Sequence, residues 1–283
     1  RGGRVVDPSQ RLDQTADLLV IDGRVAGIGT ELATPHGTAV FDARDLVVAP
    51  GLVDVHVHLR DPGFPEKETL ETGAVAAATG GFTAICCMPN TEPPLDTPER
   101  VADVVTRSRG LPVRVYPIGA ISRGRQGLEL ADLEGMAEAG AIGFSDDGDS
   151  TRDSRVMRVA LAWSARSGRP IMAHCEDRAL AAGGVMHEGA VSRELGLPGI
   201  PAAAEEIILL RDLELARLTG GWLHVLHLTT ARGRRLVRAA KLEGVRVTAE
   251  VMPHHLLLTD EWVAGRRRFA GEAEVIIGPC PDP

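Results

Sequence analysis

The chain has 283 residues, of which 44% are hydrophobic and 25% are charged, a composition typical of a globular protein and not of a disordered or fibrous one. A formal net charge of -8, without a sustained block of lysine or arginine, argues against nucleic acid or an anionic membrane as the main partner. The chain contains no apolar run of about 18 residues and no signal-peptide core at its first residues, so we expect a cytoplasmic protein that acts on a small molecule.

The first 48 residues are expected to form a small β element without helix. Residues 17–28 contain two apolar runs joined by Asp22-Gly23, a pair that favours the type I′ turn of a hairpin. Residues 38–48 repeat the strand pattern.

From Leu46 onward, strand-like apolar runs alternate with amphipathic or alanine-rich segments that end in glycine, as helices often do. The predicted strands are 46–58, 82–88, 113–118, 141–145, 170–174, 222–228 and 245–251. Such alternation predicts parallel strands joined by right-handed crossovers.

So many strand and helix units in one region favour a TIM-like (β/α)8 barrel over a doubly wound open sheet. Only seven barrel strands can be counted, and residues 271–283 contain no eighth strand with a helix. We therefore expect an incomplete barrel: either the chain is truncated or another segment closes the sheet, because two open edges would seek partners. The segment 178–202, rich in glycine and proline, is expected to be a functional loop over the barrel mouth.

Reactive side chains gather at the ends of the predicted strands, where the active sites of such barrels lie. Asn90 follows the second strand, and Asp146 and Asp147 follow the fourth. Seven of the nine histidines occupy strand ends, namely His56, His58, His174, His224, His227, His254 and His255. Neutral imidazoles with a carboxylate are the usual zinc ligands, so the sequence predicts a metal site.

The stretch VDVHVHLRDPG at 53–63 is the most informative part of this pattern. Residues two apart on a strand face the same way, so His56 and His58 can reach one metal ion, and Arg60 is expected on the same face. A guanidinium can hold a carboxylate through two hydrogen bonds. This strand therefore predicts both a metal and an anionic substrate.

Other candidate ligands have alternative explanations. The spacing of His224 and His227 places them on opposite strand faces, so we choose His227, nearer the strand end, as a ligand and expect His224 to pack. His254 and His255 are expected to support the ligands or the structure. Cys175 offers a thiolate, but a small buried hydrophobe is the commoner role for such a cysteine, and we leave it out of the metal set.

With these residues in place, the chain resembles the amidohydrolase superfamily and, within it, dihydroorotases of class I. The matching segments occur in family order: VDVHVHLRDPG (53–63), ETGAVAAATGGFTAICCMPNTEP (71–93), GFSDDG (143–148), AHCED (173–177), HVLHLTTA (224–231) and VTAEVMPHHLLLTD (247–260). The resemblance implies that residues 1–48 are the N-terminal part of a small β-sandwich and that residues 49–283 are a catalytic barrel.

The resemblance also implies one or two zinc ions at the barrel mouth. By position it assigns two histidine pairs and a bridging carboxylate, which are His56 with His58, His174 with His227, and Asp147. Arg60 and Asn90 would bind the α-carboxylate of the substrate. Hydantoinases, allantoinases and some other dihydroorotases carry a carbamylated lysine at the bridge, but the two lysines of this chain lie outside the GFSDDG segment.

The implied activity is a zinc-dependent interconversion of N-carbamoyl-L-aspartate and L-dihydroorotate in de novo pyrimidine biosynthesis. One alternative is a noncatalytic dihydroorotase-like scaffold for aspartate transcarbamoylase, against which the intact histidine set argues. Another is a different cyclic amidohydrolase, such as a hydantoinase, against which Arg60 and the lysine-free GFSDDG segment argue. A homo-oligomer and a complex with aspartate transcarbamoylase are the protein partners that the resemblance suggests.

The chain departs from the family after the seventh strand. The family continues with Asn-Pro-Pro-Leu-Arg and an eighth strand ending in Asp-His-Ala-Pro-His, whereas this chain ends in AEVIIGPCPDP. The aspartate of that motif is a zinc ligand and the general acid/base, so no catalytic acid/base residue is identified, and Asp282 is not offered as a substitute. We expect either a partial sequence of an active parent protein or a short form with very low activity.

Overall fold

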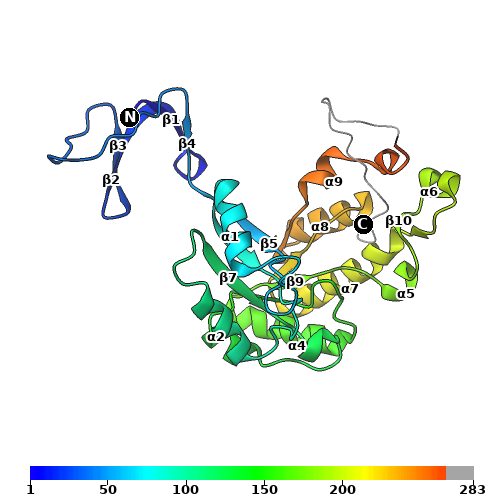
Figure 1. The fold of residues 1–283 in the computed structure, drawn as a ribbon. Helices are drawn as coiled ribbons and strands as arrows, with labels where there is room; N and C mark the ends of the chain where they lie inside the picture. Colours follow the sequence, from blue (N-terminus) through cyan, green and yellow to red (C-terminus); the bar gives the residue numbers. More distant parts are fainter. Residues whose placement is uncertain (266–283) are drawn as a thin grey trace.

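A computed structural model describes residues 1–265 of the chain (Figure 1). A four-stranded sheet near the N-terminus stands apart from a larger body, in which helices surround a seven-stranded sheet (Figure 1). The expectations for residues 271–283, including Asp282 and the absence of an eighth strand, lie outside the described residues.

The N-terminal sheet has the order β3-β2-β1-β4. Its strands are β1 (Gly3–Asp7), β2 (Leu12–Ile21), β3 (Arg24–Gly29) and β4 (Val47–Val48). The predicted turn at Asp22-Gly23 is confirmed: it joins β2 to antiparallel β3, and φ is 49° and 73°, positive at both positions as a type I′ turn requires. The strand prediction for 38–48 was largely wrong, since only Val47–Val48 pairs, in parallel with β1. A single 3-10 turn, η1 (Pro8–Gln10), interrupts the expected all-β element.

The seven strands of the larger sheet lie in chain order, and every neighbouring pair is parallel. They are β5 (Leu52–Val57), β6 (Phe82–Cys87), β7 (Arg114–Gly119), β8 (Gly143–Ser145), β9 (Ile171–Ala173), β12 (Leu223–Val225) and β13 (Val247–Ala249). A doubly wound sheet reverses its strand order at a switch point, whereas a barrel does not. The prediction of an incomplete TIM-like barrel is therefore confirmed for the described residues.

The first predicted strand, 46–58, is in fact two strands that belong to different sheets. Val47–Val48 pairs with β1, while Leu52–Val57 begins the larger sheet. Pro50 between them has no N–H for a sheet ladder. At Gly51 a Cβ atom would lie 2.1 Å from the Thr83 side chain, so the chain passes β6 where only glycine fits.

Helices follow the strands, as the alternation predicted. The longer ones are α1 (Leu70–Thr79), α2 (Pro98–Arg107), α3 (Leu133–Glu138), α4 (Ser154–Ser167), α7 (Ala203–Thr219) and α8 (Ala231–Leu242). Local signals set their ends: the Asp153 carboxylate accepts from the Arg155 N–H at the start of α4, and Gly168 ends that helix in the left-handed conformation. No helix among residues 1–265 is long and apolar enough to cross a membrane.

The segment 178–202 contains short elements of its own. These are α5 (Arg178–Ala181), β10 (Met186–His187), α6 (Ala190–Leu195) and β11 (Gly199–Ile200), and β10 pairs with β11 in parallel. Arg178, Ala181 and Gly184 line a cavity beside His174. The segment thus lies next to the end of β9, although it is more structured than a plain loop.

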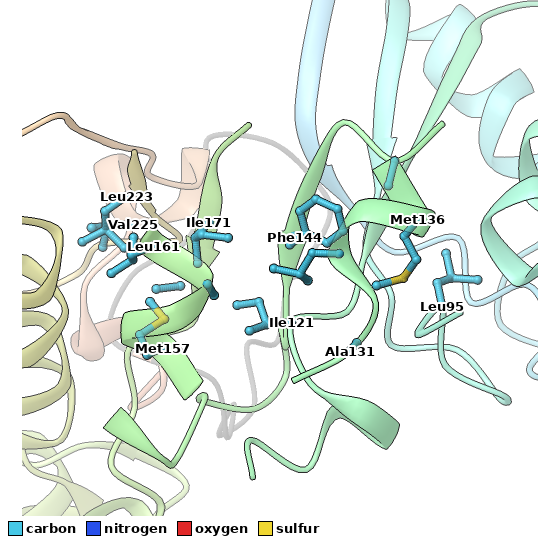
Figure 2. Close-up of a cluster of buried hydrophobic side chains, with 14 of the residues drawn as sticks. Leu95, Ile121, Ala131, Met136, Phe144, Met157, Leu161, Ile171, Leu223 and Val225 are labelled. Atoms are coloured by element: carbon cyan, nitrogen blue, oxygen red, sulfur yellow. The ribbon is translucent and has the colours of Figure 1, made fainter. Parts of the chain in front are cut away.

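Buried side chains between the sheet and its helices hold β8, β9 and β12 in place (Figure 2). Phe144 on β8 is fully buried and packs edge-to-face on Trp163 of α4, with ring centroids 5.0 Å apart. Ile171 and Leu223 are fully buried on the next two strands. Removing a side chain such as that of Phe144 costs about 3–5 kcal/mol, so this packing fixes the strands that the reactive residues follow.

Candidate metal centre

His56 and His58 lie at the end of β5 and point to the same place. The two Nε2 atoms are 3.2 Å apart, as the alternation of a strand predicts for residues two apart. Arg60 is placed differently from the expectation: β5 ends at Val57, and Arg60 has a positive φ of 57°. A turn, and not a continued strand face, therefore brings Arg60 to the cavity that the two histidines line.

His174 and His227 form a second pair on the neighbouring strands β9 and β12. The Nδ1 atom of His174 lies 2.9 Å from the Nε2 atom of His227. His174 directly follows β9, whereas His227 lies two residues beyond β12 with a positive φ of 31°. The backbone of His227 has left the extended conformation, and this turns its ring toward His174.

Asp147 lies between the two histidine pairs, on the turn after β8. Its Oδ2 atom is 3.4 Å from His56 Nε2 and 3.3 Å from His58 Nε2. Its Oδ1 atom is 3.3 Å from His174 Nδ1 and 3.6 Å from His227 Nε2. Each carboxylate oxygen thus faces one pair.

The distances from Asp147 to the four histidines suit metal coordination. Zinc bonds of about 2.0–2.2 Å in tetrahedral geometry separate two ligand atoms by roughly 3.3–3.6 Å. The described residues contain two overlapping groups that could hold an ion, His56 with His58 and Asp147, and Asp147 with His174 and His227. Imidazole nitrogens with a carboxylate are a donor set that zinc prefers, so the residues present fit one or two ions.

Asp146 and Asp147 are neighbours with different roles. The Asp146 carboxylate accepts hydrogen bonds from the Ser122 N–H, the Ser122 hydroxyl and the Thr151 hydroxyl. Burial raises the pKa of Asp146, whereas hydrogen bonds from the histidines outweigh burial and hold the pKa of Asp147 well below its usual range. Asp146 therefore ties the turn to the β7–α3 connection, and Asp147 is left to face the histidines.

Glu250 was missed by the sequence reasoning. One carboxylate oxygen makes a short contact with His56 Nδ1, and the other lies 3.2 Å from His224 Nε2. Burial alone would raise the pKa of Glu250, but its bonds to His224 and His56 lower it to about 2. The same carboxylates, Asp147 and Glu250, raise the pKa of His56 to about 9 against the effect of burial. Glu250 directly follows β13, so it lies at a strand end, as Asn90, Asp146 and Asp147 do.

His224 does more than pack. Its Nδ1 atom lies 2.8 Å from the Thr248 hydroxyl, which also accepts a hydrogen bond from the indole of Trp222. With Nε2 on Glu250, the ring connects the sheet to the carboxylate behind His56. His224 therefore holds the position of Glu250.

Asn90 orients His58. The amide oxygen of Asn90 is 2.9 Å from His58 Nδ1, so the ring donates to it and keeps Nε2 free for a metal. This bond leaves the Asn90 amide nitrogen as a donor. Burial lowers the pKa of His58, which favours the neutral ring that a metal requires.

A cavity of about 550 Å³ opens over this cluster. All seven candidate site residues line it, and so do Arg125, His254 and His255. His255 accepts a hydrogen bond from the Met252 N–H at 3.3 Å, which closes the turn before α9 (Pro253–Leu257). Cys175 is not part of the lining: it is buried, its thiol faces the Ala173 carbonyl, and burial raises its pKa well above the ordinary value.

Comparison with known proteins finds the same family in sequence. The family model described as Dihydro-orotase-like matches residues 45–232. The dihydroorotase of Pelotomaculum thermopropionicum is 50% identical over 265 residues, and that of Solibacter usitatus is 48% identical over 261 residues. These alignments cover 94% and 92% of this chain but 62% and 60% of the relatives, so the chain spans about three-fifths of their length.

Solved structures share the fold. The L-hydantoinase of Arthrobacter aurescens superimposes with a TM-score of 0.72 and the D-hydantoinase of a Thermus species with a TM-score of 0.69. Both are 23% identical to this chain, and each comparison covers 93% of it and 60% or 59% of the other protein. The chain therefore has the fold of these hydantoinases.

Proposed function

The chain belongs to the dihydro-orotase-like family, and from that premise we propose that its cavity is the site of a zinc-dependent cyclic amidohydrolase. The reaction is the interconversion of N-carbamoyl-L-aspartate and L-dihydroorotate in de novo pyrimidine biosynthesis. The observation that carries the proposal is the position of Asp147, with one oxygen toward each histidine pair, in a cavity that also holds Arg60 and Asn90.

In this proposal Asp147 is shared by two metal positions. His56 and His58 complete one, and His174 and His227 complete the other. Bound zinc supplies a Lewis acid that polarises the amide or carboxyl carbonyl and lowers the pKa of a water molecule. Glu250 and Asn90 keep the rings of His56 and His58 turned so that each Nε2 faces the cluster.

Arg60 and Asn90 bind the substrate in this scheme. The guanidinium of Arg60 and the free amide nitrogen of Asn90 donate to the α-carboxylate. Fixing that group holds the ureido nitrogen against the β-carboxyl carbon, so that ring closure, with loss of water, becomes effectively intramolecular. In the opposite direction water adds to the same carbon and the ring C–N bond breaks. We assign no general acid/base to residues 1–265.

The hydantoinase alternative has less support. The solved hydantoinases share the fold with this chain, but an identity of 23% supports no statement about the substrate. A carbamylated lysine has no candidate in the cavity lining, and the only lysines of the chain, Lys67 and Lys241, are elsewhere. A noncatalytic scaffold would have no use for five converging ligand residues.

We also propose that the chain has two domains, residues 1–48 and residues 49–283. Each described sheet stays on one side of that boundary: the four-stranded sheet ends at Val48, and the seven-stranded sheet begins at Leu52. We therefore propose that the metal centre belongs to the second part alone.

Metal analysis combined with an assay of dihydroorotate hydrolysis tests the proposal. We expect one or two zinc ions per chain, and turnover of dihydroorotate well above that of a hydantoin, which lacks the carboxylate. Zinc without turnover would limit this chain to metal binding. The absence of both zinc and turnover would contradict the proposal for this chain.

A further inference from the structure

Arg125 lines the cavity over the metal cluster but has no role in the function proposed above. It ends the 3-10 turn η2 (Arg123–Arg125) in the connection between β7 and α3. Its φ is 55°, a left-handed conformation that non-glycine residues rarely adopt. The turn therefore directs a half-buried arginine side chain toward Arg60 and Asn90, while Arg123, two residues earlier, is exposed and pairs with Glu129 at 3.4 Å.

The guanidinium of Arg125 lacks a carboxylate partner. Its Nε atom is buried without a hydrogen-bond partner among residues 1–265, and no ion pair of Arg125 within 4.0 Å occurs there. The nearby acids are engaged elsewhere: Asp149 pairs with Arg152 and Arg178, and Asp146 accepts from Ser122 and Thr151. Burying a charged group without a partner is costly, so such a group indicates a site that is completed by an anion.

Two donors converge beside Asp147. At Gly148, a Cβ atom would lie 3.2 Å from Arg125 Nη2 and 3.4 Å from Asn90 Nδ2. Gly148 has a φ of 78°, a left-handed conformation that favours glycine. An acceptor oxygen at about 2.7–3.2 Å from each donor fits in the space that this glycine leaves open.

Arg60 and Arg125 also influence each other. Burial lowers the pKa of the Arg125 guanidinium. The charges of Asp149, Asp146 and Asp147 raise this pKa, and the positive charge of Arg60, the smallest of these influences, lowers it. Two like charges in one partly buried cavity repel each other, and an anion between them would remove that repulsion.

We propose that Arg125 is a second substrate-binding guanidinium, which with Asn90 and Arg60 holds the carboxylate of the substrate over Gly148. This inference rests on the proposed function and extends it. It assigns the preference for an acidic substrate to three donors from three separate strand-end loops, instead of to Arg60 and Asn90 alone.

Binding measurements on the zinc-loaded protein test this role. The probes are L-dihydroorotate and 5,6-dihydrouracil, which has the same ring without the carboxylate, and their affinities are measured by calorimetry. Arg125→Gln should weaken dihydroorotate binding about 10- to 100-fold, because a hydrogen bond to a charged group is lost. Its affinity for dihydrouracil should stay within about twofold, and Arg125→Lys, which keeps the charge, should recover part of the loss.

Arg123→Gln is the matched control, because it removes an exposed arginine from the same turn, and it should bind both probes as the wild type does. Equal weakening of both probes by Arg125→Gln, or an unchanged affinity for dihydroorotate, would overturn the inference and leave the proposed function standing. A wild type that does not prefer dihydroorotate to dihydrouracil would overturn both. Zinc content and thermal midpoint are compared in every variant. A folding defect is then recognised because it lowers the zinc content, the thermal midpoint and the binding affinity together.

Discussion

The two histidine pairs of the metal centre differ in what lies behind each ring. His56 has the Glu250 carboxylate on its Nδ1 atom, and His58 has the Asn90 amide oxygen 2.9 Å from its own. His227 has no such side-chain hydrogen bond on Nδ1 among residues 1–265. For His174, the Glu176 carboxylate lies 4.0 Å from Nε2, beyond hydrogen-bond range.

The two pairs therefore differ in how their metal-binding histidine rings are kept in position. Partners behind a metal-binding imidazole fix its tautomer and orientation and raise its basicity. Both rings of the His56–His58 pair have this support, from β13 and from the end of β6, whereas in the second pair His227 depends on backbone placement and on Asp147. We therefore expect the first pair to bind zinc more tightly than the second.

The largest expected effect comes from removing what the two pairs share. Asp147→Asn removes the negative charge and replaces one of the two carboxylate oxygens with an amide NH2, which cannot bind a metal, so zinc content should fall close to zero. Dihydroorotate hydrolysis should fall by about 10³-fold or more, since a metal contributes several kcal/mol to the transition state. Elemental analysis and initial rates measure the two effects.

Asp146→Asn is the matched control for that variant. It should keep its zinc, because Asp146 faces Ser122 and Thr151 and not the cluster. It should lose about 1–3 kcal/mol of unfolding free energy, because buried hydrogen bonds are weakened. If Asp147→Asn held as much zinc as the wild type, the shared bridge would be disproved.

Glu250→Gln addresses the supported pair alone. Replacing the carboxylate by a neutral amide removes the charge that orients His56, so zinc affinity should fall about 10- to 100-fold at the tighter position. Competition with a chelating dye measures this affinity. Glu243→Gln, which changes an exposed glutamate paired with Arg217, should have no effect. Equal losses at both zinc positions would contradict the proposed asymmetry.

The pH dependence of the zinc-free protein sharpens the same comparison. Asp147 and Glu250 raise the pKa of His56 to about 9, above its unfolded value of 6.5. The resulting stability is fully present below pH 6.5 and is lost as the pH rises through 9, a change of up to about 3 kcal/mol. Urea unfolding between these pH values should show a smaller loss for Glu250→Gln than for the wild type. If the unfolding free energy changed with pH equally in both proteins, Glu250 would not be the group that holds the His56 proton.

Much of this centre could be predicted from sequence because parallel strands end at one edge of a sheet. That rule brought His56, Asp147, His174 and His227 together from four separate strands. The rule depends only on the order and direction of strands, which the alternating pattern reveals.

The features that the sequence did not reveal depend on turns and on residues that bind the metal-site histidines from behind. Arg60 and His227 were predicted as site residues, but the positive φ angles through which they and Arg125 reach the cavity are encoded by no strand or helix period. Glu250 was overlooked because its importance comes from His56, a residue almost two hundred positions earlier in the chain. The split between β4 and β5 was overlooked because an apolar run continues across Pro50.

The smallest expected effect concerns the second pair, His174 and His227. Glu176→Gln should change zinc affinity by less than about threefold, because the carboxylate is not hydrogen-bonded to His174 and is partly open to solvent screening. The main chain at this position is held independently, since the Glu176 N–H donates to the Ser150 hydroxyl at 2.9 Å and Ser150 in turn donates to the His174 carbonyl. The same dye competition that measures Glu250→Gln provides the comparison. A tenfold loss in Glu176→Gln would mean that this carboxylate closes on His174 when zinc is bound, and the two pairs would then be held in the same way.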